Sequence, residues 1–216
     1  MDTSGDNTLS IVLYIVVLAI FIQLAARMLA LTWAPRRFPV VAAVATVLIG
    51  VPSLLQFVWP GIAAALQRDP AATLAHGQWW RVLTALAAQD GGLVAAIFNL
   101  IVVALVVWLA EWIWGRWRTI VLFVFPSLVL NLLAIVWGQP GGGSSFASDG
   151  LLMSVAGLAL VATRSTLLRV LAALMIVVAI VLVFTADAHG VAMLLGAAGG
   201  AALGAPLRRR MLRTRT

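Results

Sequence analysis

The stretch that decides the fold is residues 92–113, GLVAAIFNLIVVALVVWLAEWI, an almost continuous apolar run. It contains one charged side chain, Glu111, close to its end. A helix of about 20 apolar residues spans the roughly 30 Å hydrocarbon layer of a bilayer. Six further apolar segments accompany it, at residues 10–32, 39–58, 119–138, 150–163, 168–186 and 190–206. The sequence therefore predicts seven membrane-spanning segments.

The composition supports this prediction. Apolar residues make up 63% of the 216-residue chain and charged residues 10%, whereas soluble domains have about 45–50% and about 25%. Backbone exposed to lipid must satisfy its own hydrogen bonds, and the alternating pattern of a membrane barrel is absent. We therefore expect an all-α polytopic membrane protein. The chain has no Cys and two His, so neither a metal site nor another cofactor is indicated.

The basic residues predict an orientation. All fourteen are Arg, and twelve of them fall on one side if the segments alternate across the membrane. Cytoplasmic loops carry such an excess of positive charge, so the N-terminus is expected outside and the C-terminus in the cytoplasm. The use of Arg to the exclusion of Lys favours a GC-rich bacterial genome, and hence the bacterial inner membrane. The basic tail indicates an orientation determinant and contact with lipid rather than a nucleic-acid partner.

The fifth segment is predicted to be short. Counting back from Arg164 to Gly150 gives about 14 residues, or about 21 Å of helix. The residues before it, 139–148, are rich in Gly and Ser and favour a loop. Asp149 would then begin a helix below the outer surface, and an ionisable residue at such depth is a candidate functional residue. His189 begins the last segment from the same side, so the two side chains are expected to meet.

Small residues predict which helices pack closely. Gly196, Gly200 and Gly204 recur every four residues on the last segment, and Gly150 and Gly157 lie on the fifth. Such spacing lets two helix backbones approach each other. We expect these two helices to be in contact.

Together these features resemble the rhomboid family of intramembrane serine proteases, which has a six-helix core. The resemblance covers roughly residues 39–206 and makes the first helix an addition. It implies three parts, namely an extra helix in 1–34, a core in 35–206 and a basic tail in 207–216. Its anchors follow the order of the family's motifs and are Gly77, Trp80, Arg81, Thr84, Asn99, Glu111, Gly115 and Arg118, followed by Gly150, Gly157, His189, Gly196 and Gly200.

The resemblance implies a serine and histidine dyad with Asn99 on the oxyanion side. His189 matches the family's histidine. The family's serine is followed at once by one Gly and eight residues later by another, and Gly150 and Gly157 then align it with Asp149. A histidine common on the oxyanion side aligns with Ala95. The dyad is therefore expected to be degenerate, because a carboxylate at that position cannot supply a hydroxyl nucleophile and would repel an oxyanion.

Three routes to activity stay open in the sequence. Ser148 is adjacent to the aligned position but would point about 100° away on a helix. Ser145 follows Gly143 and Ser144 and imitates the family's motif, although no Gly follows it. Asp149 and Asp187 would form an aspartic dyad if their carboxyls approached to about 3 Å, whereas Asp187 is also a natural cap in an outer loop.

The leading hypothesis is a catalytically inactive, rhomboid-like pseudoprotease that binds transmembrane segments of client proteins. The first alternative is an active intramembrane serine endopeptidase with an atypical site. The second is a small polytopic transporter, against which the spans contain few ionisable residues and no inverted repeat. The sequence identifies neither a client nor an oligomeric state.

Overall fold

The computed structural model describes residues 8–30 and 37–205 of the chain. The described residues form helices and no strand apart from one isolated bridge between Arg68 and Gly141. The long helices are α1 (Thr8–Ala30), α2 (Val40–Leu55), α6 (Gly92–Trp114), α7 (Arg116–Val136), α8 (Ser145–Ala162), α9 (Thr166–Phe184) and α10 (Ala188–Gly204). Between α2 and α6 lie four short elements, α3 (Gly61–Leu66), α4 (Pro70–His76), α5 (Arg81–Thr84) and the 3-10 turn η1 (Ala85–Ala87).

The seven predicted segments all correspond to long helices. Within the described residues, five of them, α1, α6, α7, α8 and α9, are long and apolar enough to cross a bilayer, and α2 and α10 are shorter apolar helices. The chain is therefore an all-α, multi-pass membrane protein. The predicted basic tail at 207–216, together with Arg36, lies outside the described residues.

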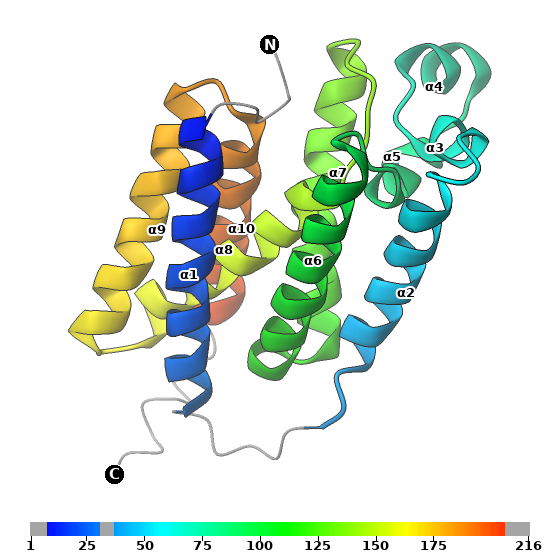
Figure 1. The fold of residues 1–216 in the computed structure, drawn as a ribbon. Helices are drawn as coiled ribbons and strands as arrows, with labels where there is room; N and C mark the ends of the chain where they lie inside the picture. The colour runs from blue at the N-terminus through cyan, green and yellow to red at the C-terminus, as the bar shows by residue number, and fades with distance from the viewer. Residues whose placement is uncertain (1–7, 31–36, 206–216) are drawn as a thin grey trace.

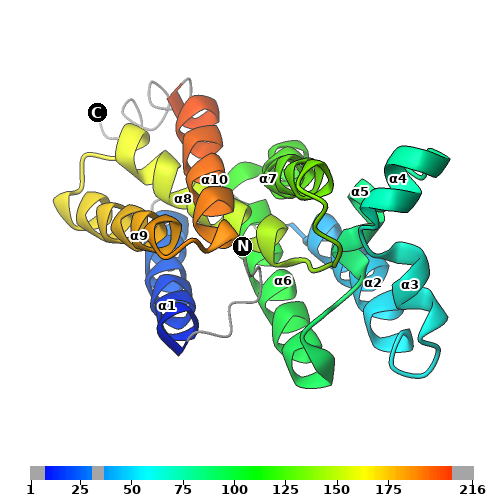
Figure 2. The same ribbon diagram turned by 90° about the horizontal axis from the view of Figure 1, so that it is seen from above.

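Helix α8 occupies the centre of the bundle. It contacts α1, α6, α7, α9 and α10, and in Figure 1 it runs obliquely between α6 and the pair formed by α9 and α10. Seen from above in Figure 2, α1 and α9 lie together on one side, and α2 with the short helices lies on the other. Most residues of α8 are buried, so its N-terminal end lies inside the bundle.

The start of α8 differs from the sequence prediction. The helix begins at Ser145 rather than at Gly150 and contains 18 residues, or about 27 Å. The break comes earlier because Gly141 and Gly143 have φ angles of 123° and 152°, which an L side chain rarely adopts. Asp149 therefore lies in the second turn of α8 and does not cap it.

The predicted close packing of α8 against α10 is confirmed. A Cβ atom added to Gly196 would lie 1.9 Å from the carbonyl oxygen of Gly150, and one added to Gly200 would lie 2.0 Å from that of Ser154. A Cβ on Gly157 would lie 2.0 Å from a carbonyl oxygen of α10. No side chain fits between the two backbones, so the glycines set the distance between these helices.

This contact predicts a large difference between two neighbouring glycines. Gly200→Ala is expected to lower the free energy of unfolding by about 1–3 kcal/mol, because α10 must move away from α8. Gly199→Ala is the matched control, because its Cβ would meet only the end of the Leu122 side chain at 3.1 Å and Ala favours the helix by about 1 kcal/mol. Thermal unfolding in detergent compares the two variants. Equal stability would contradict the packing described here.

The stretch that contains Arg81 and Thr84, between α2 and α6, holds the short helices together. The Arg81 guanidinium is buried and donates through Nη1 to the carbonyl oxygens of Ala64 and Gln67, at 2.8 and 2.9 Å. The hydroxyl of Thr84 donates to the carbonyl oxygen of Leu66 at 2.9 Å. Trp80 precedes this clamp and is exposed. Arg81 and Thr84 thus join α5 to α3.

At the opposite end of the bundle, Glu111 connects α6 to α2. Its buried carboxylate accepts a hydrogen bond of 3.0 Å from the backbone N–H of Ala42 in the first turn of α2, and it lies 3.7 Å from Nε of Arg116. Gly115 separates α6 from α7 with a φ of 75°. Arg118 follows on α7 and is exposed.

Candidate functional site

The starts of α8 and α10 place a hydroxyl against an imidazole. Ser145 is the first residue of α8, and His189 is the second residue of α10. Ser145 Oγ lies 2.9 Å from Nε2 of His189. The two side chains are 44 positions apart in the chain, and the glycine contacts between α8 and α10 bring their helix ends together. This pair has the geometry of a nucleophile and its base.

Asp187 lies on the far side of the imidazole. Its Oδ1 is 2.8 Å from His189 Nδ1 and also accepts a hydrogen bond of 3.0 Å from the His189 backbone N–H. Asp187 is therefore the N-cap of α10, as the sequence suggested, and an orienting group for His189 as well. Burial alone would raise the pKa of Asp187, but hydrogen bonds from His189 and Tyr14 and the charge of His189 hold it below its usual value.

The hydrogen bonds assign the tautomer of His189. Because Asp187 is ionised and accepts only, the proton of the neutral imidazole lies on Nδ1. Nε2 then carries a lone pair directed at the hydroxyl of Ser145. Ser145, His189 and Asp187 thus form a hydrogen-bonded chain in the order hydroxyl, imidazole, carboxylate.

Phe146 packs beside this chain. Its ring centroid lies 4.7 Å from that of His189, and the guanidinium carbon of Arg68 lies 5.9 Å from the centre of the same ring. Phe146 is almost fully buried. The ring thus limits movement of the imidazole and separates it from the nearby cation.

Asp149 lies one turn beyond Ser145 on α8, within electrostatic range of His189 and Asp187. Within the described residues it forms no ion pair with His189 and does not bond to Asp187, whose two oxygens are held by His189 and Tyr14. The structure thus does not form the suggested aspartic dyad. Ser148 is also directed elsewhere, since its hydroxyl donates to the backbone oxygens of Ser144 and Ser145 at 3.3 and 3.0 Å.

Removing the charge of Asp149 is expected to have a modest effect. Asp149→Asn should change the rate at which Ser145 reacts with a serine-directed probe by less than roughly tenfold, since the carboxylate both stabilises the protonated imidazole and repels a developing oxyanion, and the two effects oppose each other. The rate of fluorophosphonate labelling measures this effect. Complete loss of labelling in a folded Asp149→Asn variant would contradict the assignment of the site to Ser145.

Asn99 reaches the site through another amide. Its Nδ2 donates to Oε1 of Gln89 at 3.0 Å, and Nε2 of Gln89 lies 3.3 Å from the hydroxyls of both Ser53 and Ser144. Gln89 is buried and pairs with Gln56 through its backbone. Asn99 is therefore part of a polar network that ends at the residue before Ser145, and its own amide does not bond to Ser145.

A second set of contacts holds the glycine-rich loop before α8. Arg68 and Gly141 exchange two backbone hydrogen bonds of 2.7 and 3.2 Å, and the Arg68 side chain bonds to Asn131 of α7. The carboxylate of Asp90 accepts from the backbone N–H of Gly142 at 2.6 Å. Asn131 thus joins α7 to Arg68 in the connection between α3 and α4, and the glycine-rich loop enters α8 in a defined position.

No family model, curated protein or solved structure matches this chain. The arrangement of the site is therefore judged on its own chemistry. In the described part of the chain, no three His, Asp or Glu side chains come together in a way that could hold a metal ion. The polar groups at this point are the hydroxyl of Ser145, the imidazole of His189 and the carboxylate of Asp187.

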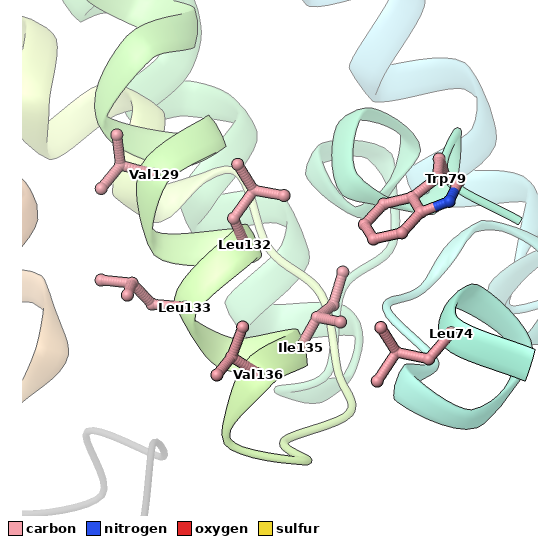
Figure 3. Close-up of a pocket in the computed structure, with 7 residues that line it drawn as sticks. All are labelled: Leu74, Trp79, Val129, Leu132, Leu133, Ile135 and Val136. Atoms are coloured by element: carbon pink, nitrogen blue, oxygen red, sulfur yellow. The ribbon is translucent and has the colours of Figure 1, made fainter. Parts of the chain in front are cut away.

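The structure also contains a pocket away from this site. It has a volume of about 350 Å³ and lies between α7 and the α4–α5 region. Figure 3 shows Leu74 and Trp79 facing the side chains of α7 across it. The residues from α7 are Val129, Leu132, Leu133, Ile135 and Val136. The lining is apolar and includes none of the residues around Ser145, so it adds no chemical group to the site.

Sequence reasoning missed two features of the site. It considered Asp187 as a cap and not as the partner of His189, although a cap two residues before a histidine places its carboxylate close to that side chain. It gave no role to Tyr14, the single tyrosine of the chain, whose hydroxyl bonds to Asp187. The spacing of the glycines pointed to Asp149, whereas the hydroxyl that bonds to His189 belongs to Ser145.

Proposed function

We propose that this chain is an intramembrane serine peptidase of the rhomboid type, with Ser145 as nucleophile and His189 as general base. The observation that carries this proposal is the distance of 2.9 Å between Ser145 Oγ and His189 Nε2, with Asp187 bonded to the other ring nitrogen. A hydroxyl, an imidazole and a carboxylate in this order define acyl-transfer chemistry on many unrelated folds.

In the proposed reaction, Ser145 Oγ attacks the carbonyl carbon of a peptide bond while His189 Nε2 takes the hydroxyl proton. The ionised Asp187 stabilises the imidazolium that results. His189 then gives the proton to the leaving amine, and an acyl-enzyme remains on Ser145. Water, activated by the same imidazole, releases the acyl group and restores the hydroxyl.

The start of α8 also offers stabilisation for the oxyanion. The first N–H groups of a helix have no partner within that helix, and the positive end of the helix dipole favours a developing negative charge. Ser145 lies at this end of α8. Backbone donors next to Ser145 therefore take the role that the resemblance gives to a histidine absent from this chain.

The substrate class follows from the position of the site. Ser145 begins a helix of about 27 Å that is surrounded by α1, α6, α7, α9 and α10. A peptide bond reaches Ser145 only if its segment enters the bundle from the membrane or from the nearby surface. We infer that the substrates are transmembrane segments of other proteins, cleaved close to one side of the bilayer.

The proposed topology puts this site at the outer side of the inner membrane of a bacterium. Arg27 in the last turn of α1, Arg116 at the start of α7, and Arg164 between α8 and α9 mark one end of the bundle. In Figure 1, α8 begins within the bundle and runs towards the arginine-bearing end, and α10 begins on the side away from that end. With the arginine-bearing end in the cytoplasm, the N-terminus and the site face outward.

A second candidate function is the binding of transmembrane clients without cleavage. The observation that favours it is the carboxylate of Asp149, which lies within electrostatic range of His189 and disfavours another negative charge nearby. In that case the hydrogen bonds around His189 hold α1, α8 and α10 together, and the protein acts through its helix surfaces.

One experiment separates the two functions. The purified protein is reconstituted in liposomes with transmembrane reporter substrates, and a fluorophosphonate probe is added in parallel. We expect labelling of Ser145, located by mass spectrometry, and cleavage of a reporter. An unlabelled, folded protein that still co-purifies with reporter segments would overturn the peptidase proposal in favour of client binding.

A further inference from the structure

The helix that stands outside the six-helix resemblance contributes a side chain to the site. Tyr14 lies on α1, and its hydroxyl donates to Oδ2 of Asp187. The hydroxyl oxygen of Tyr14 also lies 3.0 Å from Nδ1 of His189. The two rings meet edge to face, with centroids 5.2 Å apart and an interplanar angle of 64°. Tyr14 thus contacts both Asp187 and the imidazole of His189.

We propose that Tyr14 is a positioning residue for the Asp187 and His189 pair, which makes α1 a required part of the proposed active site. This inference rests on the proposed function. A helix that served only for packing would not need the hydroxyl of Tyr14, whereas a helix that takes part in the reaction would.

The hydrogen bonds explain why one hydroxyl has this effect. Oδ1 of Asp187 holds both the side chain and the backbone N–H of His189, and Tyr14 holds Oδ2. The two oxygens thus have different partners, which hold the carboxylate in a single orientation. The phenolic oxygen of Tyr14 also faces Nδ1 and stabilises the positive charge that forms on the ring. Without the hydroxyl, the carboxylate is free to turn and the imidazole loses its alignment with Ser145.

The packing of α1 keeps Tyr14 in register. Val17, Phe21, Leu24 and Ala25 are fully buried on one stripe of the helix, at the spacing of successive turns from Tyr14. This stripe faces α8, α9 and α6, and Figure 2 shows α1 beside α9 and close to α8. A shift of α1 along its axis would withdraw the hydroxyl from Asp187.

The first test compares a change at the hydroxyl with a change in packing. Tyr14→Phe keeps the ring and is expected to lower the maximal rate of fluorophosphonate labelling about tenfold, with the half-saturating probe concentration unchanged. Met175→Ala is the matched control, because it creates a cavity in the buried core at α9 and belongs neither to the site nor to the stripe that holds Tyr14 in register. It is expected to lower thermal stability more than Tyr14→Phe and to leave the labelling rate within about twofold of wild type.

The second test uses the fact that the chain has a single tyrosine. Biosynthetic incorporation of fluorotyrosine places one fluorine label, at Tyr14. We expect its fluorine NMR signal to shift in Asp187→Asn and in His189→Gln, and to shift again when the probe reacts with Ser145. The fluorine signal of a tyrosine with a purely structural role would not change when Ser145 reacts with the probe. An unchanged signal after labelling would therefore overturn the inference.

The outcomes distinguish this inference from the function on which it rests. If wild type is labelled at Ser145 and Tyr14→Phe is labelled equally fast, the positioning role of Tyr14 is wrong and the proposed function stands. If folded wild type shows neither labelling nor cleavage, the proposed function is wrong, and the role of Tyr14 in it is overturned as well.

Discussion

Ser145→Ala is expected to abolish both fluorophosphonate labelling and reporter cleavage, with a fall in rate of at least about 10³-fold. The reason is chemical, because Ala has no oxygen to attack a carbonyl or a phosphonate. The fold should persist, since Ser145 is only half-buried and begins α8 rather than lying within its packed core. Gel fluorescence of the reconstituted variant and its thermal unfolding measure the two effects.

The matched control for this variant is Ser148→Ala. Ser148 lies on the same helix one turn later, and its hydroxyl bonds to the backbone of α8 rather than to His189. We expect Ser148→Ala to be labelled at close to the wild-type rate. If labelling disappears in Ser148→Ala and survives in Ser145→Ala, the nucleophile is Ser148 and the site proposed here is wrong.

Asp187→Asn is the second change with a large expected effect. It should lower the labelling rate by about 10²- to 10⁴-fold, because an amide no longer stabilises the imidazolium and allows the wrong tautomer of His189. The pKa of Asp187 lies below its usual value, so the carboxylate that is lost is ionised throughout the neutral range. The pH dependence of labelling in wild type is then expected to reflect His189 and not Asp187.

The choice of Asn separates this effect from folding. Asn is as good an N-cap as Asp, whereas Ala costs about 1 kcal/mol at such a position. Asp187→Asn should therefore unfold at nearly the wild-type temperature, and Asp187→Ala should lose both activity and stability. A folded Asp187→Asn variant with wild-type labelling would show that His189 acts without its acid, as a dyad.

The membrane-spanning character was predictable because it depends on composition over long segments. The run at 92–113 has few alternatives to a helix in lipid. The contact of α8 with α10 was predictable for a similar reason, since glycines at four-residue spacing leave one face without side chains. Both features follow from patterns that are local in the sequence.

The beginning of α8 was not predictable in the same way. Residues 145–149 are Ser, Phe, Ala, Ser and Asp, and their helix propensities differ by only a few tenths of a kcal/mol from those of loop residues. Tertiary contacts decide the outcome, because Phe146 packs against His189 and Arg68. A helix boundary predicted five residues late puts Ser145 in a loop and Asp149 at the start of the helix.

The contribution of α1 was even less accessible to sequence reasoning. Tyr14 and His189 are 175 positions apart, and nothing in the pattern of α1 distinguishes Tyr14 from an interfacial aromatic residue. Gly150 is required by close packing against Pro126 of α7 and Gly157 by close packing against α10, so their distance from Ser145 carries no information about the nucleophile.

The absence of side chains between α8 and α10 has a consequence for how this protein can change over evolutionary time. Ser145 and His189 stand at the ends of two helices whose separation is set by backbone against backbone. Lipid-facing residues can be exchanged with little effect on that separation, whereas a side chain at Gly157, Gly196 or Gly200 would meet the backbone of the facing helix and push the two helices apart. Variation among descendants of this chain should therefore be broad in the lipid-facing residues and narrow at these three positions.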